Sequence, residues 1–296
     1  MTIYGAIEAG GTKFVCGIGD GHSGSIETAT IPTRDPDSTF ADVDAFFHMA
    51  RRHGPIEAIG IASFGPVELR PLADNYGRIL STPKRQWEGA DILARTLSIL
   101  DVPAAIDTDV NAAALAEAAR TNVAHLAYVT VGTGIGVGLV NDGRPVHGIG
   151  HPEAGHILPR RHPAHDGFGG ICPFHGDCLE GLASGPALAA FWGETPSHFP
   201  EDHPFWTVQA HYLAQLCVTL FLTMAPERIV LGGGVMKQQR LFPAIHRQTA
   251  ALLAGYFGGA TSEEAMAERI VPPVCTEPPG LVGAYLLAAQ ANRCIV

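Results

Sequence analysis

The chain has 296 residues, a formal net charge of −10 and 46% apolar residues. This length suits one large or two medium α/β domains, and the apolar content is that of a well-buried globular protein. The negative charge argues against a nucleic-acid partner, because such proteins need a basic face to replace phosphate counterions. No run of 18 apolar residues is present, so no membrane-spanning helix and no membrane partner are expected.

The first residues enter a strand-like apolar run at once, with no basic and apolar leader. Export is therefore not expected, and the predicted compartment is the reducing cytoplasm. Disulfides are rare there, and of the six cysteines only Cys172 and Cys178 lie close together in the sequence. A metal site is the better interpretation of this pair.

The predicted elements are short apolar runs and helices with apolar residues at helical spacing. The first part of the chain predicts strands over 3–9, 14–18, 26–31, 56–62 and 103–106, and helices over 40–50 and 112–119. The second part predicts strands over 126–131, 135–140 and 229–231, and helices over 208–224, 239–254 and 281–291. Residues 147–180 are rich in His, Pro and Gly and predict a long functional loop.

Three glycine-rich turns follow predicted strands. They are Gly10-Gly11-Thr12-Lys13, Gly132-Thr133-Gly134-Ile135-Gly136 and Gly232-Gly233-Gly234. Backbone N–H groups in such turns can point at one anion, and Thr and Lys add a donor and a charge. None matches a Walker loop. One such turn alone is more often a tight hairpin, but three together predict a nucleotide held between two related halves of the chain.

Asp107-Thr108-Asp109-Val110-Asn111 leaves a predicted strand and enters a helix. The simpler interpretation is an N-cap, which satisfies free backbone donors. Two acids and an Asn exceed what a cap needs, however, and catalytic groups usually lie at the carboxyl ends of strands in α/β sheets. One carboxylate could be the base that takes a proton from an alcohol attacking a phosphoryl group.

The loop carries a dense group of potential metal ligands. Cys172, His175 and Cys178 follow one another at intervals of three residues, and with a second histidine they supply the closed tetrahedral set that structural zinc requires. His156 and His162 compete for the fourth position, and spacing does not decide between them. A Cys172–Cys178 disulfide or two free thiols are the alternatives. Upstream, Glu153 could accept hydrogen bonds from sugar hydroxyls, although a solvated loop carboxylate is equally consistent with its spacing.

Together these motifs resemble the ROK family of sugar kinases, and more closely its zinc-containing bacterial fructokinase branch. The resemblance extends over nearly the whole chain. It rests on residues 5–13, 63–67, 107–111, 132–136, 151–156, 172–181 and 231–236. The Cys/His segment is the most specific of these motifs.

The resemblance implies an actin-like ATPase fold of the ribonuclease H-like type, an α/β protein with two lobes around a nucleotide cleft. The smaller lobe would comprise 1–112 and 281–296, and the larger lobe 113–280. The activity implied is ATP-dependent, Mg²⁺-assisted phosphorylation of fructose, with mannose as a possible second sugar, by a cytoplasmic homodimer. Another hexose, such as mannose, glucose or an amino sugar, is the alternative substrate.

The resemblance also assigns residue roles. Asp109 matches the catalytic base. The nucleotide would be bound by Gly11, Thr12, Lys13, Thr133, Gly134, Pro186, Gly232, Gly233, Gly234 and Lys237. The sugar would be bound by Gly65, Thr108, Asp109, Glu153, His156 and Glu180. A structural zinc ion would be held by His156, Cys172, His175 and Cys178, which by analogy favours His156 over His162.

Three departures separate the chain from glucokinases of the family. Glu8 and Thr108 stand where those proteins usually carry Asp and Asn, and His175 replaces the middle Cys of their zinc segment, one residue later. All three follow the fructokinase branch. The family also contains sugar-responsive repressors, but these carry a DNA-binding domain before the motif with the first glycine turn, which here begins at residue 5. The acidic charge also opposes DNA binding.

Overall fold

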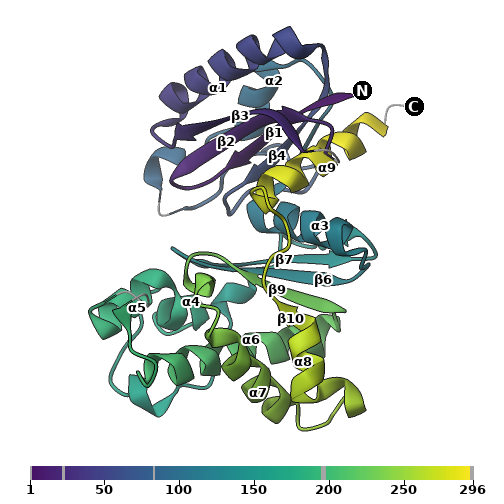
Figure 1. The fold of residues 1–296 in the computed structure, drawn as a ribbon. Coiled ribbons are helices and arrows are strands. Elements are labelled where there is room, and N and C mark those ends of the chain that lie inside the picture. Colours follow the sequence, from purple (N-terminus) through teal and green to yellow (C-terminus); the bar gives the residue numbers. More distant parts are fainter. Residues whose placement is uncertain (1, 22–23, 83, 195–197, 294–296) are drawn as a thin grey trace. The chain divides into compact units, whose positions relative to one another are not determined.

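The computed structural model describes residues 2–21, 24–82, 84–194 and 198–293. The chain forms two compact units (Figure 1). The first contains the chain up to residue 120, residues 144–151 and the chain from 275 onward, and the second contains 121–143 and 152–274. The lobes expected from the resemblance, residues 1–112 with 281–296 and residues 113–280, remain a prediction.

The first unit is a mixed sheet covered by helices. Its elements are β1 (Ile3–Ala9), β2 (Lys13–Gly19), β3 (Ser25–Pro32), α1 (Pro36–Ala50), β4 (Ile56–Ser63), α2 (Ile92–Ile99), β5 (Ala104–Thr108), α3 (Asp109–Thr121) and α9 (Pro279–Arg293). The strand order is β3-β2-β1-β4-β5. Strand β2 is antiparallel to β1 and β3, while β1, β4 and β5 are parallel.

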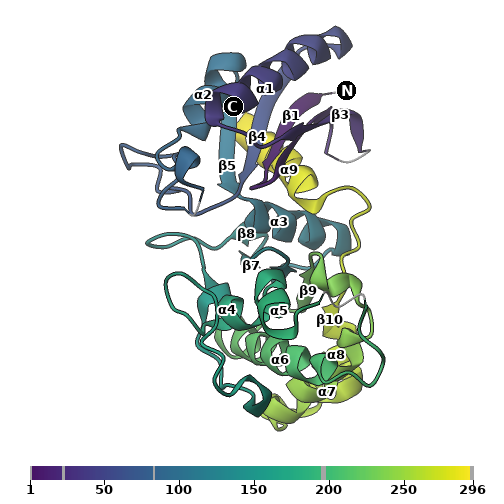
Figure 2. The same ribbon diagram turned by 90° about the vertical axis from the view of Figure 1, so that its left-hand side faces the viewer.

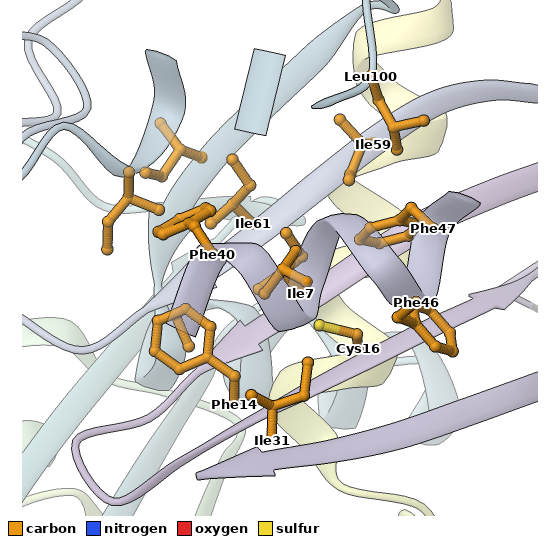
Figure 3. Close-up of a cluster of buried hydrophobic side chains, with 14 of the residues drawn as sticks. Ile7, Phe14, Cys16, Ile31, Phe40, Phe46, Phe47, Ile59, Ile61 and Leu100 are labelled. Carbon is orange, nitrogen blue, oxygen red and sulfur yellow. The ribbon is translucent and has the colours of Figure 1, made fainter. Parts of the chain in front are cut away.

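Alternation along the strands gives this sheet two different faces. On one face, apolar side chains of the strands pack with Phe40, Phe46 and Phe47 of α1 (Figure 3). On the other face, α9 packs against β1, β4 and β5, as Figure 2 also indicates. Residues facing α9 are small: a Cβ on Gly60 would lie 1.8 Å from the carbonyl oxygen of Ala284. Small residues there allow the helix backbone to approach the sheet closely.

The second unit repeats the opening pattern of the first. Its elements are β6 (Leu126–Val131), β7 (Ile135–Asn141), α4 (Leu179–Ala183), α5 (Gly185–Trp192), α6 (Phe205–Met224), β9 (Arg228–Gly232), α7 (Leu241–Leu253), α8 (Glu263–Arg269) and β10 (Ile270–Val271). The order β10-β9-β6-β7 places the hairpin partner β7 antiparallel to β6 and places β9 and β10 parallel on the other side. The two-residue β8 (Arg144–Pro145) begins the segment that belongs to the first unit.

Most predicted elements are confirmed, with small differences at their ends. Both glycine hairpins form, and residues 147–180 contain only short elements, including the 3₁₀ turns Ala154–His156 and Pro163–His165, until α4 begins. The short helices α2, α4, α5 and α8 were not predicted, because five to eight residues give too little periodicity to recognise. Among the described residues, no helix combines the length and apolar character that a bilayer crossing requires.

Candidate active site

Three predicted site motifs of the first unit follow adjacent parallel strands. Ala9, Ser63 and Thr108 are register partners at the carboxyl ends of β1, β4 and β5. The first glycine turn, the segment from Phe64 and the Asp109 segment start from these ends, so the topology brings them to one edge of the sheet. Such edges are where ligands bind in α/β sheets.

The first glycine turn is tight and presents polar groups outward. The N–H of Gly10 donates to the carbonyl of Lys13 (3.0 Å), and a Cβ on Gly10 would lie 2.7 Å from that carbonyl oxygen. The hydroxyl of Thr33 donates to the carbonyl of Gly10 (2.7 Å) and braces the turn. Thr12 and Lys13 are exposed and Gly11 is partly exposed, so this turn has accessible donors for an anion.

Glu8 points toward the start of α9. The N–H of Leu281 donates to its carboxylate, and a Cβ on Gly280 would lie 2.7 Å from Oε1. Burial raises the pKa of Glu8, and the nearby Lys13 charge opposes that rise. Its Oε2 has no hydrogen-bond partner among the described residues.

The carboxylate of Asp107 is the centre of a buried hydrogen-bond network. Its Oδ1 accepts from the N–H of Thr108 and from Nδ2 of Asn111, both at 2.7 Å, and its Oδ2 lies 3.0 Å from Nε2 of His147. The hydrogen bond to Asp107 raises the pKa of His147, against the effect of partial burial. His147 is not among the predicted site residues, because its partner Asp107 lies 40 residues earlier in the chain.

The N-cap of α3 is provided by Thr108 and not by a carboxylate. Its hydroxyl accepts from the N–H of Asn111 at 3.1 Å. Asp109, the predicted base, is partly exposed at the first helical position, where its Oδ1 accepts from the N–H of Val110 (2.9 Å). Thr108 and Asp109 thus each accept from one free N–H at the start of α3.

Gly65 precedes a cis peptide bond to Pro66. A Cβ on Gly65 would lie 3.3 Å from Nε2 of His151, which belongs to the same unit. The absent side chain thus leaves room for this histidine beside the end of β4.

The second and third glycine turns meet at one edge of the second sheet. The N–H of Gly132 donates to the carbonyl of Gly134 (2.9 Å), and a Cβ on Gly233 (φ 90°) would lie 2.5 Å from the carbonyl of Val131. Gly132 lies next to Gly234, whose nitrogen is 4.0 Å from a Cβ built on Gly132.

Helix α5 completes this edge. The N–H of Gly185 donates to the carbonyl of Gly132 at 2.7 Å, and Pro186 occupies the first turn of the helix. Lys237 is exposed at the end of a 3₁₀ turn that follows the third glycine turn, and Thr133 is exposed in the second. The residues predicted to bind the nucleotide in this unit therefore lie around β6 and β9.

Three residues predicted to contact the sugar in the second unit lie together. Nε2 of His156 is 4.0 Å from Oε1 of Glu180. Burial raises the pKa of Glu153. The charge of His156 opposes this rise, and the charge of Glu180 adds to it. Oε2 of Glu180 also accepts from the N–H of Ile135 (2.9 Å), so this carboxylate links the loop to the second glycine turn.

The predicted metal ligands form one cluster. The ligand atoms of His156, Cys172, His175 and Cys178 all lie within 4.8 Å of one another. Nδ1 of His156 is 3.4 Å from Sγ of Cys178 and 3.7 Å from Sγ of Cys172. Neither cysteine forms a disulfide. Burial, and to a smaller extent the neighbouring Cys172 thiol, raises the pKa of Cys178 to about 11. A dication would reverse this by stabilising both thiolates, and the S₂N₂ set fits zinc.

The competing histidines have other surroundings. Nδ1 of His162 accepts from the N–H of Ala164 (3.1 Å), and its ring faces His211. His165 is buried among aromatic rings, beside the hydroxyl of Tyr212 (3.1 Å), and burial lowers its pKa to about 4. Neither belongs to the four-residue cluster.

Lys84 was missed by reasoning from sequence. Its Cε lies 3.2 Å from the position a Cβ would take on Gly11, so its side chain covers the first glycine turn. The available signal was composition: the chain has only three lysines, Lys13, Lys84 and Lys237, among 19 Lys and Arg. The other two had already been assigned to glycine turns.

Comparison with known proteins extends these observations. The ROK family matches residues 4–291. A fructokinase of Zymomonas mobilis is 41% identical over 98% of both chains, and a fructokinase of Lactococcus lactis is 42% identical over 86% of both. A ROK family glucokinase from Streptomyces griseus in complex with glucose and AMPPNP superimposes with a TM-score of 0.71 at 23% identity, covering 98% of this chain and 99% of the other. The fold is therefore that of the actin-like ATPases.

Proposed function

Because the chain belongs to the ROK family, we propose that it transfers the terminal phosphoryl group of ATP to the terminal hydroxyl of D-fructose, giving fructose 6-phosphate and ADP. The similarity to proteins named fructokinase supports fructose as the sugar. The observation that carries the chemistry is the alignment of Ala9, Ser63 and Thr108. This register brings the first glycine turn, Gly65 and Asp109 to one sheet edge.

Asp109 is the general base in this proposal. The sugar hydroxyl oxygen forms a bond to the γ-phosphorus while the bond from that phosphorus to the β–γ bridging oxygen breaks, and the hydroxyl proton passes to the Asp109 carboxylate. The hydroxyl of Thr108 supplies the helix cap beside it. A general base acts in its deprotonated form.

The glycine turns stabilise the charge of the phosphates. We assign this role to the N–H groups of Gly11 and Thr12, the ammonium of Lys13, Thr133 and Gly134. The adenosine end is bound by Gly232, Gly233, Gly234, Lys237 and Pro186. Bound Mg²⁺ supplies further positive charge at the β- and γ-phosphates. Phosphoryl transfer depends mainly on such positioning and electrostatic stabilisation.

The proposed sugar-binding residues are Gly65, Thr108, Glu153, His156 and Glu180. His156, Cys172, His175 and Cys178 would hold a zinc ion with no open position. Its role is structural, because four protein ligands leave no site for a water nucleophile. The carboxylates of Glu153 and Glu180 accept hydrogen bonds from vicinal hydroxyls, and the metal fixes the loop that carries them.

Asp109→Asn tests the proposal. Loss of a general base typically costs about 10²–10⁴-fold in rate, so we expect kcat with fructose and ATP to fall by that factor with little change in KM. A coupled assay of ADP release measures it. Asp101→Asn, an exposed carboxylate in the loop before β5, is the control and should retain wild-type turnover. Near-normal activity of Asp109→Asn would show that the base is misassigned.

A panel of sugars tests the substrate. Fructose should give the highest kcat/KM among fructose, mannose, glucose and amino sugars, with mannose as a weaker second substrate. A higher value for another hexose would exclude fructose as the preferred sugar and leave the phosphoryl-transfer proposal intact.

The assembly and the compartment of the enzyme are proposed by similarity to the family. We propose a homodimer in the cytoplasm, where reducing conditions keep Cys172 and Cys178 available as metal ligands. Light scattering of the purified protein should give twice the 31.2 kDa chain mass, and a monomer at micromolar concentration would contradict the dimer.

A further inference from the structure

Lys84 brings a second ammonium group to the first glycine turn. Its Cε lies 3.2 Å and its Cδ 3.9 Å from the place of a Cβ on Gly11. A Cβ at position 11 would require the lysine stem to shift by a few tenths of an ångström. Lys13 begins the strand after the same turn, so two of the chain's three lysines meet here.

Lys84 lies 73 positions after Gly11 in the sequence. The packing of the residues that follow Lys84 explains how its side chain reaches the first glycine turn. Lys84 precedes a 3₁₀ turn, Arg85–Trp87, and the N–H of Trp87 donates to its carbonyl (2.8 Å). The Trp87 side chain is 1% exposed and packs on Phe14, with ring centroids 5.3 Å apart. Since Phe14 directly follows Lys13, this contact holds the Lys84 segment against the start of β2.

Trp87 also fixes the segment by a directional contact. Its Nε1 donates to the carbonyl of Arg34 at 2.7 Å. A buried indole with its polar group satisfied is a rigid anchor. The backbone at Lys84 is therefore held at the turn, and its flexible side chain covers Gly11.

Within the described ranges, no acidic side chain lies within the 4.0 Å that defines an ion pair with Lys84. Sixteen of the chain's 19 basic residues are arginines, and Arg34, Arg52, Arg70 and Arg78 are all paired with carboxylates. A compact ammonium at a glycine turn without an acidic partner suits a phosphate group, as in the lysine of P-loops.

We propose that Lys84 contacts the terminal phosphate of ATP and stabilises the charge of the phosphoryl group during transfer. This inference rests on the proposed function. Lys84 and the first glycine turn share a unit and a sheet edge with Asp109, where the sugar hydroxyl attacks, whereas the adenosine end is assigned to residues of the second unit. As the bond to the β–γ bridging oxygen breaks and the bond to the sugar oxygen forms, negative charge stays on the three other γ-oxygens, within reach of the ammonium.

Lys84→Met, which keeps the aliphatic stem, tests this contact. Loss of one positioned donor to developing charge lowers kcat by roughly 10²–10³-fold, and we expect that loss with an unchanged KM for fructose. Affinity for Mg²⁺–AMPPNP, measured by calorimetry, should fall about 10-fold or more. Affinity for Mg²⁺–ADP, which lacks the terminal phosphate, should stay within about threefold of wild type.

The control is Arg85→Met, which removes the neighbouring exposed cation and should leave kcat and both affinities unchanged. If Lys84→Met lowers the melting temperature, the binding measurements are made with Lys84→Gln and Lys84→Arg instead. Partial recovery of AMPPNP affinity in the arginine variant alone then supports the contact. Equal AMPPNP affinity in wild type and all Lys84 variants overturns it, as does an equal loss of ADP and AMPPNP affinity.

The binding measurements separate this proposal from the substrate assignment. If the wild type binds AMPPNP more tightly than Lys84→Met but does not phosphorylate fructose, the choice of sugar is wrong and the role of Lys84 stands. If fructose is phosphorylated equally well by both proteins, the role of Lys84 is wrong and the proposed function stands.

Discussion

At the scale of single residues, Asp107 shows how a buried charge is maintained beside a catalytic candidate. Its side chain is almost fully buried, a position that is costly for a carboxylate without partners. Three donors surround it: the N–H of Thr108, Nδ2 of Asn111 and Nε2 of His147. Because Thr108 and Asn111 flank Asp109, these hydrogen bonds hold the backbone that carries the proposed base.

The pairing of His147 with Asp107 predicts a pH dependence. A histidine whose pKa rises above 6.5 on folding contributes stability below that pH, and the contribution is lost as pH increases through the raised value. We therefore expect His147→Gln to lower the melting temperature at pH 6 more than at pH 9. Thermal unfolding of the two proteins across this range measures the difference.

Asp107→Asn provides the matched check by NMR titration of the histidine side chains. Without the carboxylate, the pKa of His147 should fall. The pKa of Tyr76, which burial and then the Asp107 charge raise, should fall as well. An unchanged His147 titration would mean that this pair does not form in solution.

At the scale of elements, the metal loop and the second glycine turn are joined into one structure. Glu180 follows the proposed ligand Cys178 by two residues and accepts from the N–H of Ile135. Gly155, next to the proposed ligand His156, packs so closely that a Cβ would lie 1.8 Å from the carbonyl of Ile135. Residues beside two of the proposed ligands therefore contact the start of β7.

Removal of a metal ligand tests the cluster. We expect about one zinc ion per purified chain from the four-ligand set. Cys178→Ser should lose it, with a drop in metal affinity larger than the roughly 10–100-fold typical of losing an outer-shell partner. Inductively coupled plasma mass spectrometry gives the metal content, and thermal unfolding gives the accompanying loss of stability.

Two controls from the same unit decide between ligand sets. Cys217→Ser changes a buried cysteine of α6 outside the cluster, and His162→Ala removes the competing histidine. Both should retain zinc. Zinc retained by Cys178→Ser, or lost from His162→Ala, would contradict the proposed set.

At the scale of the whole molecule, the C-terminal helix completes the unit that the N-terminal strand begins. Helix α9 packs on β1, β4 and β5, and its Gly283 meets the backbone of Ala112 in α3, where a Cβ would lie 1.9 Å from the carbonyl oxygen. The first unit is thus built from both ends of the sequence. Its stability depends on a close helix–sheet contact between segments more than 200 residues apart.

Gly60→Ala tests this contact. A Cβ at position 60 would lie 1.8 Å from the carbonyl oxygen of Ala284, so the helix must shift. Overpacking of this kind costs about 1–3 kcal/mol, and urea unfolding should show a loss in that range. Gly150→Ala, where an added Cβ meets nothing within 4 Å, should change the free energy of unfolding little. Equal stability of the two variants would show that α9 is not held so closely.

Much of the fold could be predicted because its signals are local. Apolar runs interrupted by Gly10–Lys13 and Gly132–Gly134 define the two hairpins, and the helix after Asp109 follows from apolar spacing and alanine content. The short helices α2 and α5 could not be predicted, because their residues are placed by capping at Asp91 and Ser184 and by packing more than by periodicity.

The residues of the candidate site also fall into those that local motifs predict and those that depend on contacts between distant segments. Local motifs were sufficient to propose a catalytic carboxylate in residues 107–111, the glycine turns and the Cys/His segment, because the chemistry of each depends on neighbouring residues. The family resemblance then favoured Asp109 and His156. Neither could pair His147 with Asp107 or bring Lys84 to Gly11. These are relations between distant segments, and only tertiary packing decides them, because the contacts of Trp87 with Phe14 and of Asp107 with His147 exist only once the chain is folded.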